Sequence, residues 1–427
     1  MKHTSLLIPL LTAAIVFVGL MTGREPVVRE KQQSAASKSA ERICSLSDVI
    51  GLFNDHIFPQ SDYQALNYDE QIGVWISYID LDSMMNGRTA DEFRESISQA
   101  YRNVVSVGAN TVYVHVRAFA DAYYPSVMYP YTTAFGSTEP YDALEIMVEE
   151  AHKLGLSFHA WLNPLRCMTP ESFENVDGKY GLKSFYTEHF GEYLNTAEGS
   201  PFVWLDPAVP EVRKYVADAA AEIVSRYEVD GIHIDDYFYP TTSEDFDRVC
   251  FENSGAQDLS KWRMSNTTKL VLEMNISIKN TNPTVCFEIS PQGNINNNYV
   301  QLYADVGSWC ASPLICDNII PQVYFSYGSS SPYLDTIQKW SDMTSDSGVK
   351  LVIGLGVYKI AEETEFAQTE NIIAKQMNDA LALDNVSGVA FYNYSTLFTN
   401  DVSLAEKMDS EREAIIECLA GADGDNY

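Results

Sequence analysis

The alternation of apolar and polar residues is clearest at positions 229–240, which read Val-Asp-Gly-Ile-His-Ile-Asp-Asp-Tyr-Phe-Tyr-Pro. Two isoleucines alternate there with His233 and Asp235, and this two-residue period is that of a β-strand. Asp236 and two tyrosines follow at the expected end of the strand, before Pro240 terminates it. The stretch therefore predicts a buried strand that ends in a pair of acids among aromatic side chains.

Apolar runs of this kind recur along the chain, separated by polar loops and by stretches with a helical period. We expect strands at 71–79, 111–116, 157–162, 231–235, 285–290, 318–323, 350–355 and 388–392. We expect helices near 90–107, 141–154, 210–227, 259–281 and 402–419, and a long insertion between 166 and 201. Alternating strands and helices indicate a parallel sheet, and eight such units over residues 70–420 predict an α/β fold, the (β/α)8 TIM barrel.

The residues before the barrel predict export. Residues 1–23 have a short basic start and then an apolar run, which fits a signal peptide or a membrane anchor. No small-x-small cleavage site follows, so both alternatives stay open. Residues 24–69 are expected to be a polar linker, to about residue 42, and a short lead-in. The expected location is outside the cytoplasm, either secreted or anchored at the cell envelope.

Charge and cysteine content narrow the classes of partner. With 28 basic and 59 acidic residues the formal net charge is −31, which repels nucleic acid and anionic membrane surfaces. Neither a GxGxxG nor a GxxxxGK[ST] loop occurs, so no nucleotide cofactor is expected. The seven cysteines are scattered without metal spacing; Cys310 and Cys316 are candidates for a small-loop disulfide, and Cys286 is expected to be core.

In a parallel barrel the side chains at the carboxyl ends of the strands share one site. The candidates for substrate binding there are Trp75, Arg117, Tyr124, Trp161, Asn163, Arg166, Asp206, His233, Tyr237, Gln322, Tyr324 and Tyr392. The strand ends also carry Tyr78, His115, Asp121, Gln292 and Asn393. Aromatic faces together with amide and charged groups suit sugars, which offer apolar ring faces and many hydroxyls. A polysaccharide is therefore the expected partner.

Cleavage of a glycosidic bond needs two carboxyl groups, one of them protonated. Asp235 and Glu288 are expected on neighbouring strands, with Asp235 ionised as the nucleophile of a retaining glycosidase. Glu288 stands in an apolar strand, where burial is expected to raise its pKa and make it the general acid. Asp236 is the alternative to Asp235, and an inverting mechanism stays open if Asp206 or Asp236 acts as base.

Several motifs resemble the glycosyl hydrolase-like 10 family of secreted bacterial barrels. They are Gly-Val-Trp at 73–75, Asn-Thr-Val-Tyr at 110–113, His-Ala-Trp-Leu-Asn-Pro at 159–164, Trp-Leu-Asp-Pro at 204–207, the stretch at 230–240, Ile-Ser-Pro at 289–291 and Pro-Gln-Val-Tyr at 321–324. The resemblance implies a glycoside hydrolase on a TIM barrel, and in some members a role in cutting peptidoglycan glycan strands that lack stem peptides. Residues 230–237 also resemble the chitinase pattern Asp-Gly-x-Asp-x-Asp-x-Glu, but Tyr237 stands where that family has its acid.

Two other classes of function compete with this interpretation. One is a carbohydrate-binding barrel that has lost catalysis, which would use the same aromatic contacts. The other is a metal-dependent hydrolase or deacetylase with His233, Asp235 and Asp236 as ligands. Only seven histidines occur and none forms an HxxxH pair, so no metal is expected.

Overall fold

The computed structural model describes residues 58–362 and 364–424, so the predictions for residues 1–23 and 24–42 lie outside it. Eight parallel strands close into one barrel, in the order β1-β2-β3-β6-β7-β8-β9-β10. They are β1 (Gln71–Ile76), β2 (Thr111–Arg117), β3 (Ser157–Leu162), β6 (Gly231–Ile234), β7 (Cys286–Ile289), β8 (Asn318–Ile319), β9 (Lys350–Gly356) and β10 (Val386–Tyr392). All eight expected strands are present, which confirms the TIM barrel.

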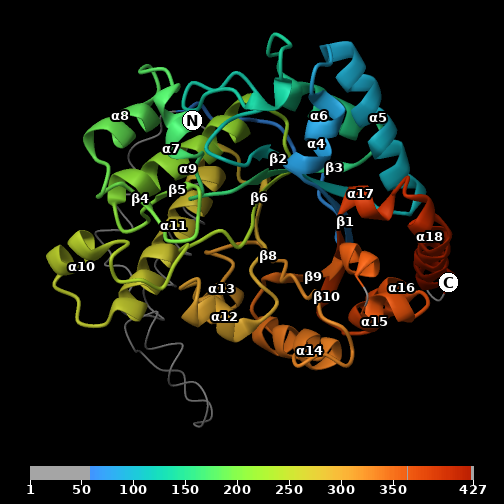
Figure 1. The fold of residues 1–427 in the computed structure, drawn as a ribbon. Helices are drawn as coiled ribbons and strands as arrows, with labels where there is room; N and C mark the ends of the chain where they lie inside the picture. The colour runs from blue at the N-terminus through green and yellow to red at the C-terminus, as the bar shows by residue number, and fades with distance from the viewer. Residues whose placement is uncertain (1–57, 363, 425–427) are drawn as a thin grey trace, which may run out of the picture.

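Helices form a ring around the strands (Figure 1). The longer ones are α5 (Ala90–Ser106), α6 (Ala143–Lys153), α9 (Pro210–Arg226), α11 (Leu259–Thr281), α14 (Tyr333–Thr344), α16 (Ile372–Leu381) and α18 (Val402–Gly424). Local sequence sets where they begin: Thr89 and Glu92 form a capping box for α5, and Pro210 opens α9. The apolar sides of the helices pack on the strands in one continuous core.

Shorter elements lie in the loops between strands and after β10. They are α7 (Pro170–Glu174), α8 (Gly181–Glu188), the hairpin β4 (Leu194–Thr196) and β5 (Val203–Leu205), α10 (Arg248–Ser254), α12 (Ile295–Val300), α13 (Val306–Cys310), α15 (Glu365–Gln368), α17 (Tyr394–Leu397), and the 3-10 turns η1 (Thr133–Phe135) and η2 (Val357–Ala361). The expected insertion after β3 is thus two short helices and a hairpin.

The first strand ends earlier than the sequence pattern predicts. Expected to run to residue 79, it stops at Ile76, because Ser77 caps a new helix, α4 (Tyr78–Met85). The Ser77 backbone N–H donates to Asp80 Oδ2 at 2.7 Å, and the Asp80 N–H donates to Ser77 Oγ at 3.4 Å. Strand β8 is also shorter than expected, because beyond Ile319 pairing is reduced to isolated bridges at Gln322.

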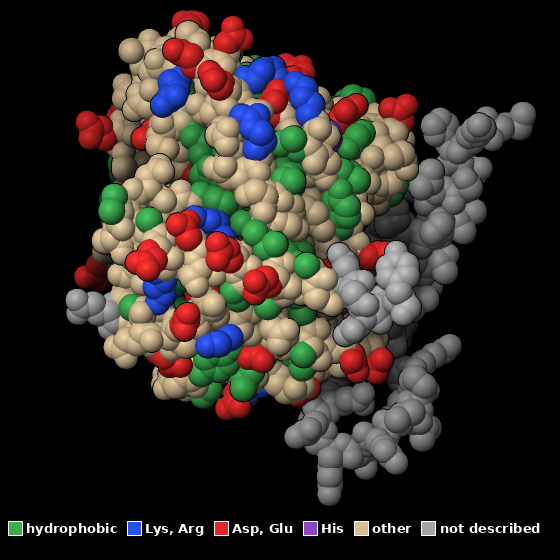
Figure 2. All heavy atoms as spheres, turned by 90° about the vertical axis from the view of Figure 1, so that its right-hand side faces the viewer, with side chains coloured by type: hydrophobic (Ala, Val, Ile, Leu, Met, Phe, Trp, Pro, Cys, Tyr) green, Lys and Arg blue, Asp and Glu red, His purple; other side chains and the backbone are tan. Residues whose placement is uncertain are grey.

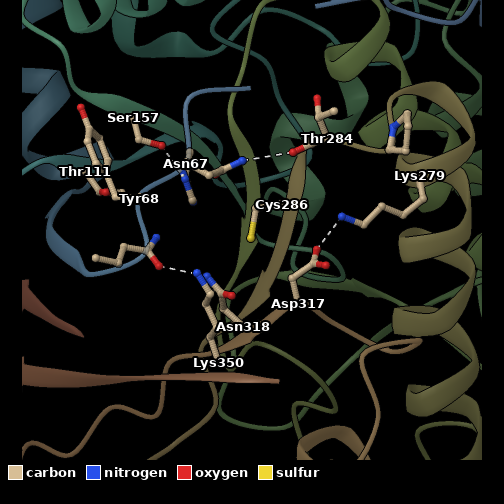
Figure 3. A pocket seen from close by; sticks show the side chains of 13 residues that line it. Asn67, Tyr68, Thr111, Ser157, Lys279, Thr284, Cys286, Asp317, Asn318 and Lys350 are labelled. Atoms are coloured by element: carbon tan, nitrogen blue, oxygen red, sulfur yellow. Dashed lines mark hydrogen bonds and ion pairs between the residues drawn. The ribbon is translucent and has the colours of Figure 1, made fainter. Parts of the chain in front are cut away.

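At the amino ends of the strands, the described part of the lead-in packs against the barrel. The Tyr63 hydroxyl donates to Asp230 Oδ1 at 2.7 Å, and the Leu66 N–H donates to the same oxygen at 2.6 Å. A cavity of about 210 Å³ lies at this end (Figure 3). In it Lys279 and Asp317 point toward one another and form an ion pair of 2.6 Å.

Cysteine pairing differs from the expectation. Cys310 and Cys316 are buried free thiols, so the candidate disulfide between them is not formed. Cys286 lies in the interior as expected. Figure 2 shows acidic side chains spread over one whole face among fewer basic ones, in keeping with the net charge. None of the helices in residues 58–362 and 364–424 is long and apolar enough to span a membrane.

Candidate active site

A pocket of about 240 Å³ opens at the carboxyl ends of the strands. Nine of the predicted site residues line it: Trp75, Trp161, Arg166, Asp235, Asp236, Tyr237, Gln322, Tyr324 and Tyr392. They come from β1, β3 and β10 and from the loops after β3, β6 and β8. This is the end of a TIM barrel at which enzymes of this fold carry their active sites.

Asp235 follows β6 directly and is only 3% exposed. Its Oδ2 accepts hydrogen bonds from the indole N–H of Trp161, at 3.0 Å, and from the amide of Asn163. The Asn163 oxygen in turn accepts from the Arg166 guanidinium, so Arg166 orients the amide that contacts the acid. Burial and the charge of Asp236 raise the pKa of Asp235 from 3.8 to about 7. With a pKa near neutrality Asp235 is only partly ionised at pH 7, which differs from the expectation that it stays ionised.

Asp236 lines the same pocket and is partly buried. Burial raises its pKa, while hydrogen bonds from Gln292 and Gln322 lower it. The Gln322 amide donates to Asp236 Oδ1 at 3.3 Å and to the Ser290 carbonyl at 3.1 Å. The charge on Asp236 contributes to the raised pKa of Asp235, so the titrations of the two neighbouring carboxyl groups are linked.

Aromatic rings form much of the remaining wall. The rings of Tyr324, Tyr358 and Tyr392 lie 5.7 to 5.8 Å apart pairwise, and Trp75 lies 6.1 Å from Tyr392. At the rim the Arg166 guanidinium lies 3.9 Å from the ring centroid of Tyr237, a cation–π contact. Such a wall offers apolar faces beside polar groups, the combination that sugar rings require.

Glu288 does not line this pocket. It is fully buried in the lower part of the barrel, where Gln71 and Asn318 donate to its Oε1 at 2.8 and 2.7 Å. Its Oε2 lies 2.6 Å from His159 Nδ1 and 3.4 Å from His233 Nδ1. Burial alone raises the pKa of Glu288, but these two histidines outweigh burial and hold it well below its ordinary value. The prediction of a raised pKa is wrong, and an ionised Glu288 cannot donate a proton.

Strand register explains the position of Glu288. Glu288 is paired with His233, two residues before Asp235 on the neighbouring strand. Successive inward-facing positions are two residues apart, so Ser290, not Glu288, stands at the level of Asp235. Ser290 accordingly lines the pocket.

Five further predicted residues lie outside the pocket lining. Asn163 acts through Asp235, as described above, and His233 accepts a hydrogen bond of 3.0 Å from the indole N–H of Trp75. Arg117 follows a register shift in β2 and places its guanidinium over the Tyr129 ring, at 4.7 Å.

The other two are Tyr124 and Asp206. The Tyr124 hydroxyl faces Glu222 at 3.5 Å. Asp206 is fully buried and accepts from the Ala208 N–H at 2.8 Å, and burial raises its pKa to about 7. Neither residue is brought to the two acids by the fold.

The lining also includes residues that were not among the predicted contacts, namely Ser77, Tyr78, Ile79, His115, Ser290 and Tyr358. His115 and Tyr78 could be identified as strand-end residues. For Ser77 and Ile79, the available signal was the Ser77-x-x-Asp80 capping pattern at the start of α4. Among the described residues no group of three or more His, Cys, Asp or Glu side chains could hold a metal ion.

A parallel (β/α)8 barrel whose carboxyl-end pocket holds two acids among aromatic rings has the architecture of TIM-barrel glycoside hydrolases. Solved structures share the fold. The glycoside hydrolase domain of PgaB (BpsB) from Bordetella bronchiseptica aligns with a TM-score of 0.57 and 11% identity, over 81% of this chain and 99% of that one. The catalytic domain of β-amylase from Paenibacillus polymyxa aligns with a TM-score of 0.55 and 11% identity, over 83% and 99%.

Sequence comparison identifies the family. The sequence model of the glycosyl hydrolase-like 10 family matches residues 70–371. Glycosyl hydrolase DigH of Escherichia coli K12 is 32% identical over 320 residues, 67% of this chain and 72% of its own length. Glycosyl hydrolase YngK of Bacillus subtilis 168 is 30% identical over 368 residues, 79% of this chain and 71% of its own length. The chain belongs to the glycosyl hydrolase-like 10 family, which supports a glycosidase-type function.

Proposed function

We propose that the chain hydrolyses O-glycosidic bonds of an extracellular or cell-wall polysaccharide, with Asp235 and Asp236 as the carboxyl pair. The observation that carries the proposal is their shared pocket together with the pKa of about 7 for Asp235. Glycoside cleavage requires one carboxyl group that holds a proton at working pH and one that does not. The proposal does not use Glu288 as the acid, because Glu288 lies outside this pocket and two histidines hold its pKa low.

In the proposed reaction protonated Asp235 donates to the glycosidic oxygen as the bond from that oxygen to the anomeric carbon breaks. Ionised Asp236 stabilises the positive charge that develops on the sugar ring. Water then attacks the anomeric carbon and gives a proton to the Asp235 carboxylate, which restores the starting state. Trp161 and Asn163 hold the acid through its Oδ2, while aromatic side chains of the wall support the sugar faces.

The substrate part of the proposal rests on the family. The chain's resemblance to this family points to peptidoglycan glycan strands without stem peptides as the substrate. Residues 1–23 are expected to direct export to the compartment where such strands occur. The net charge of −31 favours solubility and does not select the sugar.

The test uses the purified full chain with peptide-free peptidoglycan strands, chitin oligomers and α-glucans, and mass spectrometry identifies the products. We expect cleavage of one of these, lost by a factor of about a thousand or more in Asp236→Asn and Asp235→Asn. Asp384→Asn, which changes an exposed carboxylate far along the chain, serves as the control and should cleave normally.

Roles are separated with an aryl glycoside whose leaving group is acidic. Such a leaving group needs no proton, so Asp235→Asn should recover much of its turnover on it while Asp236→Asn should not. Wild-type chain that binds glycans as tightly as both variants, yet cleaves none, would establish a carbohydrate-binding barrel instead.

A further inference from the structure

Two polar atoms in the pocket wall have no hydrogen-bond partner in the protein: His115 Nε2 and Ser290 Oγ. Both side chains are almost fully buried, at 2% and 1% exposed. Buried polar atoms in folded proteins are nearly always paired, because an unpaired one loses its hydration without compensation. Of the unpaired buried side-chain atoms in the described residues, only these two belong to the pocket lining.

The proton position on His115 is set by its surroundings. The Tyr78 backbone N–H, at the start of α4, donates to His115 Nδ1 at 3.1 Å, so Nδ1 carries the lone pair. Burial and the positive charge of Arg166 hold the pKa of His115 well below its ordinary value, so the ring is neutral. The single ring proton is therefore on Nε2, and that atom is a hydrogen-bond donor.

His115 is also fixed in relation to the reacting groups. Its ring stacks on Trp161, with centroids 3.4 Å apart and planes at 20°. The Trp161 indole N–H donates to Asp235 Oδ2 at 3.0 Å. Because its ring is stacked on one side and hydrogen-bonded at Nδ1, His115 loses little conformational entropy when a ligand binds.

Ser290 lies on the other side of Asp235, at the same level of the barrel. Its backbone N–H donates to the Ile234 carbonyl at 2.7 Å, and its carbonyl accepts from Gln322 at 3.1 Å. The backbone of Ser290 is thus fully engaged and only the hydroxyl is free to bind something in the pocket.

We propose that His115 Nε2–H and Ser290 Oγ hydrogen-bond to ring oxygen substituents of the sugar next to Asp235, and that they determine which sugar the site accepts. The ligand class is a pyranose with a hydroxyl or carbonyl oxygen facing His115 and a hydroxyl facing Ser290. A site built to pair with a hydroxyl rejects the analogue that lacks it, because its own buried polar atom is then left unpaired. This inference rests on the proposed glycoside-binding function of the pocket.

Two substitutions at one position isolate the donor. In His115→Asn the side-chain oxygen can still accept from the Tyr78 N–H, but no group reaches the place of Nε2. In His115→Gln the amide N–H reaches toward that place, although the bond to Tyr78 is lost. Both variants lose the stacking on Trp161, and His115→Gln also loses the bond to Tyr78, so tighter binding by His115→Gln than by His115→Asn can come only from the donor. Ser290→Ala removes the second contact with little change of volume.

The probes are a chitin tetrasaccharide, its monodeoxy derivatives and a peptide-free peptidoglycan tetrasaccharide, with Kd measured by calorimetry and kcat and KM from product formation. We expect His115→Asn to weaken Kd or raise KM about tenfold to a hundredfold, with smaller changes in kcat, and His115→Gln to recover most of the loss. Wild type should discriminate against one monodeoxy derivative, and His115→Asn should no longer do so. Ser290→Ala should lose discrimination against a different derivative.

The outcomes separate the two proposals. Cleavage in which His115→Asn and Ser290→Ala keep the wild-type preference among the derivatives overturns this inference alone. Binding with the expected loss of discrimination, but without cleavage by wild type, overturns the hydrolase and leaves the inference standing. A wild-type chain that binds neither tetrasaccharide and cleaves none of the three classes of glycan contradicts both.

Discussion

The raised pKa of Asp235 predicts that this carboxyl group lowers the free energy of unfolding once it is ionised. The folded protein keeps the Asp235 proton up to about pH 7, whereas the unfolded chain releases it near the ordinary value of 3.8. Between these values the folded state binds more protons, so the stability of the wild type falls as the pH rises from about 4 to about 7 and is level above that. Asp235→Asn removes the titration while its side-chain oxygen can still accept from Trp161 and Asn163.

The magnitude follows from the difference between the two pKa values. Each pKa unit corresponds to about 1.4 kcal/mol, so the ionised carboxylate costs about 4 kcal/mol above pH 7. Asp235→Asn should therefore raise the free energy of unfolding by about 4 kcal/mol at pH 8. At pH 5 the gain should shrink to about 1.5 kcal/mol, because there the wild type still benefits from its retained proton.

Urea titrations of both proteins at pH 5 and pH 8, followed by circular dichroism, measure this difference. Asp384→Asn, which removes an exposed carboxylate, provides the control. An Asp235→Asn gain of equal size at both pH values, or a loss of stability at pH 8, would refute the link between burial, proton retention and the proposed acid. The assay needs no substrate, so it stands apart from the search for the glycan.

Other expectations follow from the same structure. On a cleaved glycan, kcat/KM should fall about tenfold per pH unit above about pH 7, as Asp235 loses its proton, and should also fall in acid as Asp236 gains one; a flat profile from pH 6 to 9 contradicts the assignment. Glu288→Gln, which removes a buried carboxylate hydrogen-bonded to His159, should lower the free energy of unfolding by about 1.5 to 3 kcal/mol in a urea titration at pH 7, and an unchanged midpoint speaks against that contact. Reducing agent should leave Tm unchanged, and Cys310 and Cys316 should react with a thiol reagent only after unfolding, since both are buried free thiols.

Local patterns predicted the barrel well because they act over short distances. The helix expected at 259–281 is observed at Leu259–Thr281, where Asp258 caps its start. The strand that ends in Asp235 was legible from the alternation of apolar and polar residues alone. The acids of the pocket were found for the same reason, since strand ends mark the site in this fold.

Features that depend on how strands align could not be predicted in this way. Glu288 faces inward as expected, but its pairing with His233 places it one layer below Asp235. Arg117 stands two residues beyond His115, and the shift in register between them leaves His115 in the pocket and turns Arg117 toward Tyr129. The period of hydrophobicity encodes neither strand register nor a bulge. Glu288 was therefore expected at the same level of the barrel as Asp235, although it lies one layer below.

The hydrogen bonds around Glu288 have a consequence for how the chain assembles. Gln71 stands at the beginning of the barrel sequence, and it meets Glu288 and Asn318 across 217 and 247 positions of chain. A fragment that ends after β6 lacks Glu288, and a fragment that begins after β6 lacks Gln71. Either fragment leaves buried polar groups without their hydrogen-bond partners, which is strongly unfavourable. Stable half-barrels are therefore disfavoured. Pairing of β1 with β10 closes the barrel, and with this step the stability of the early strands depends on that of the late ones.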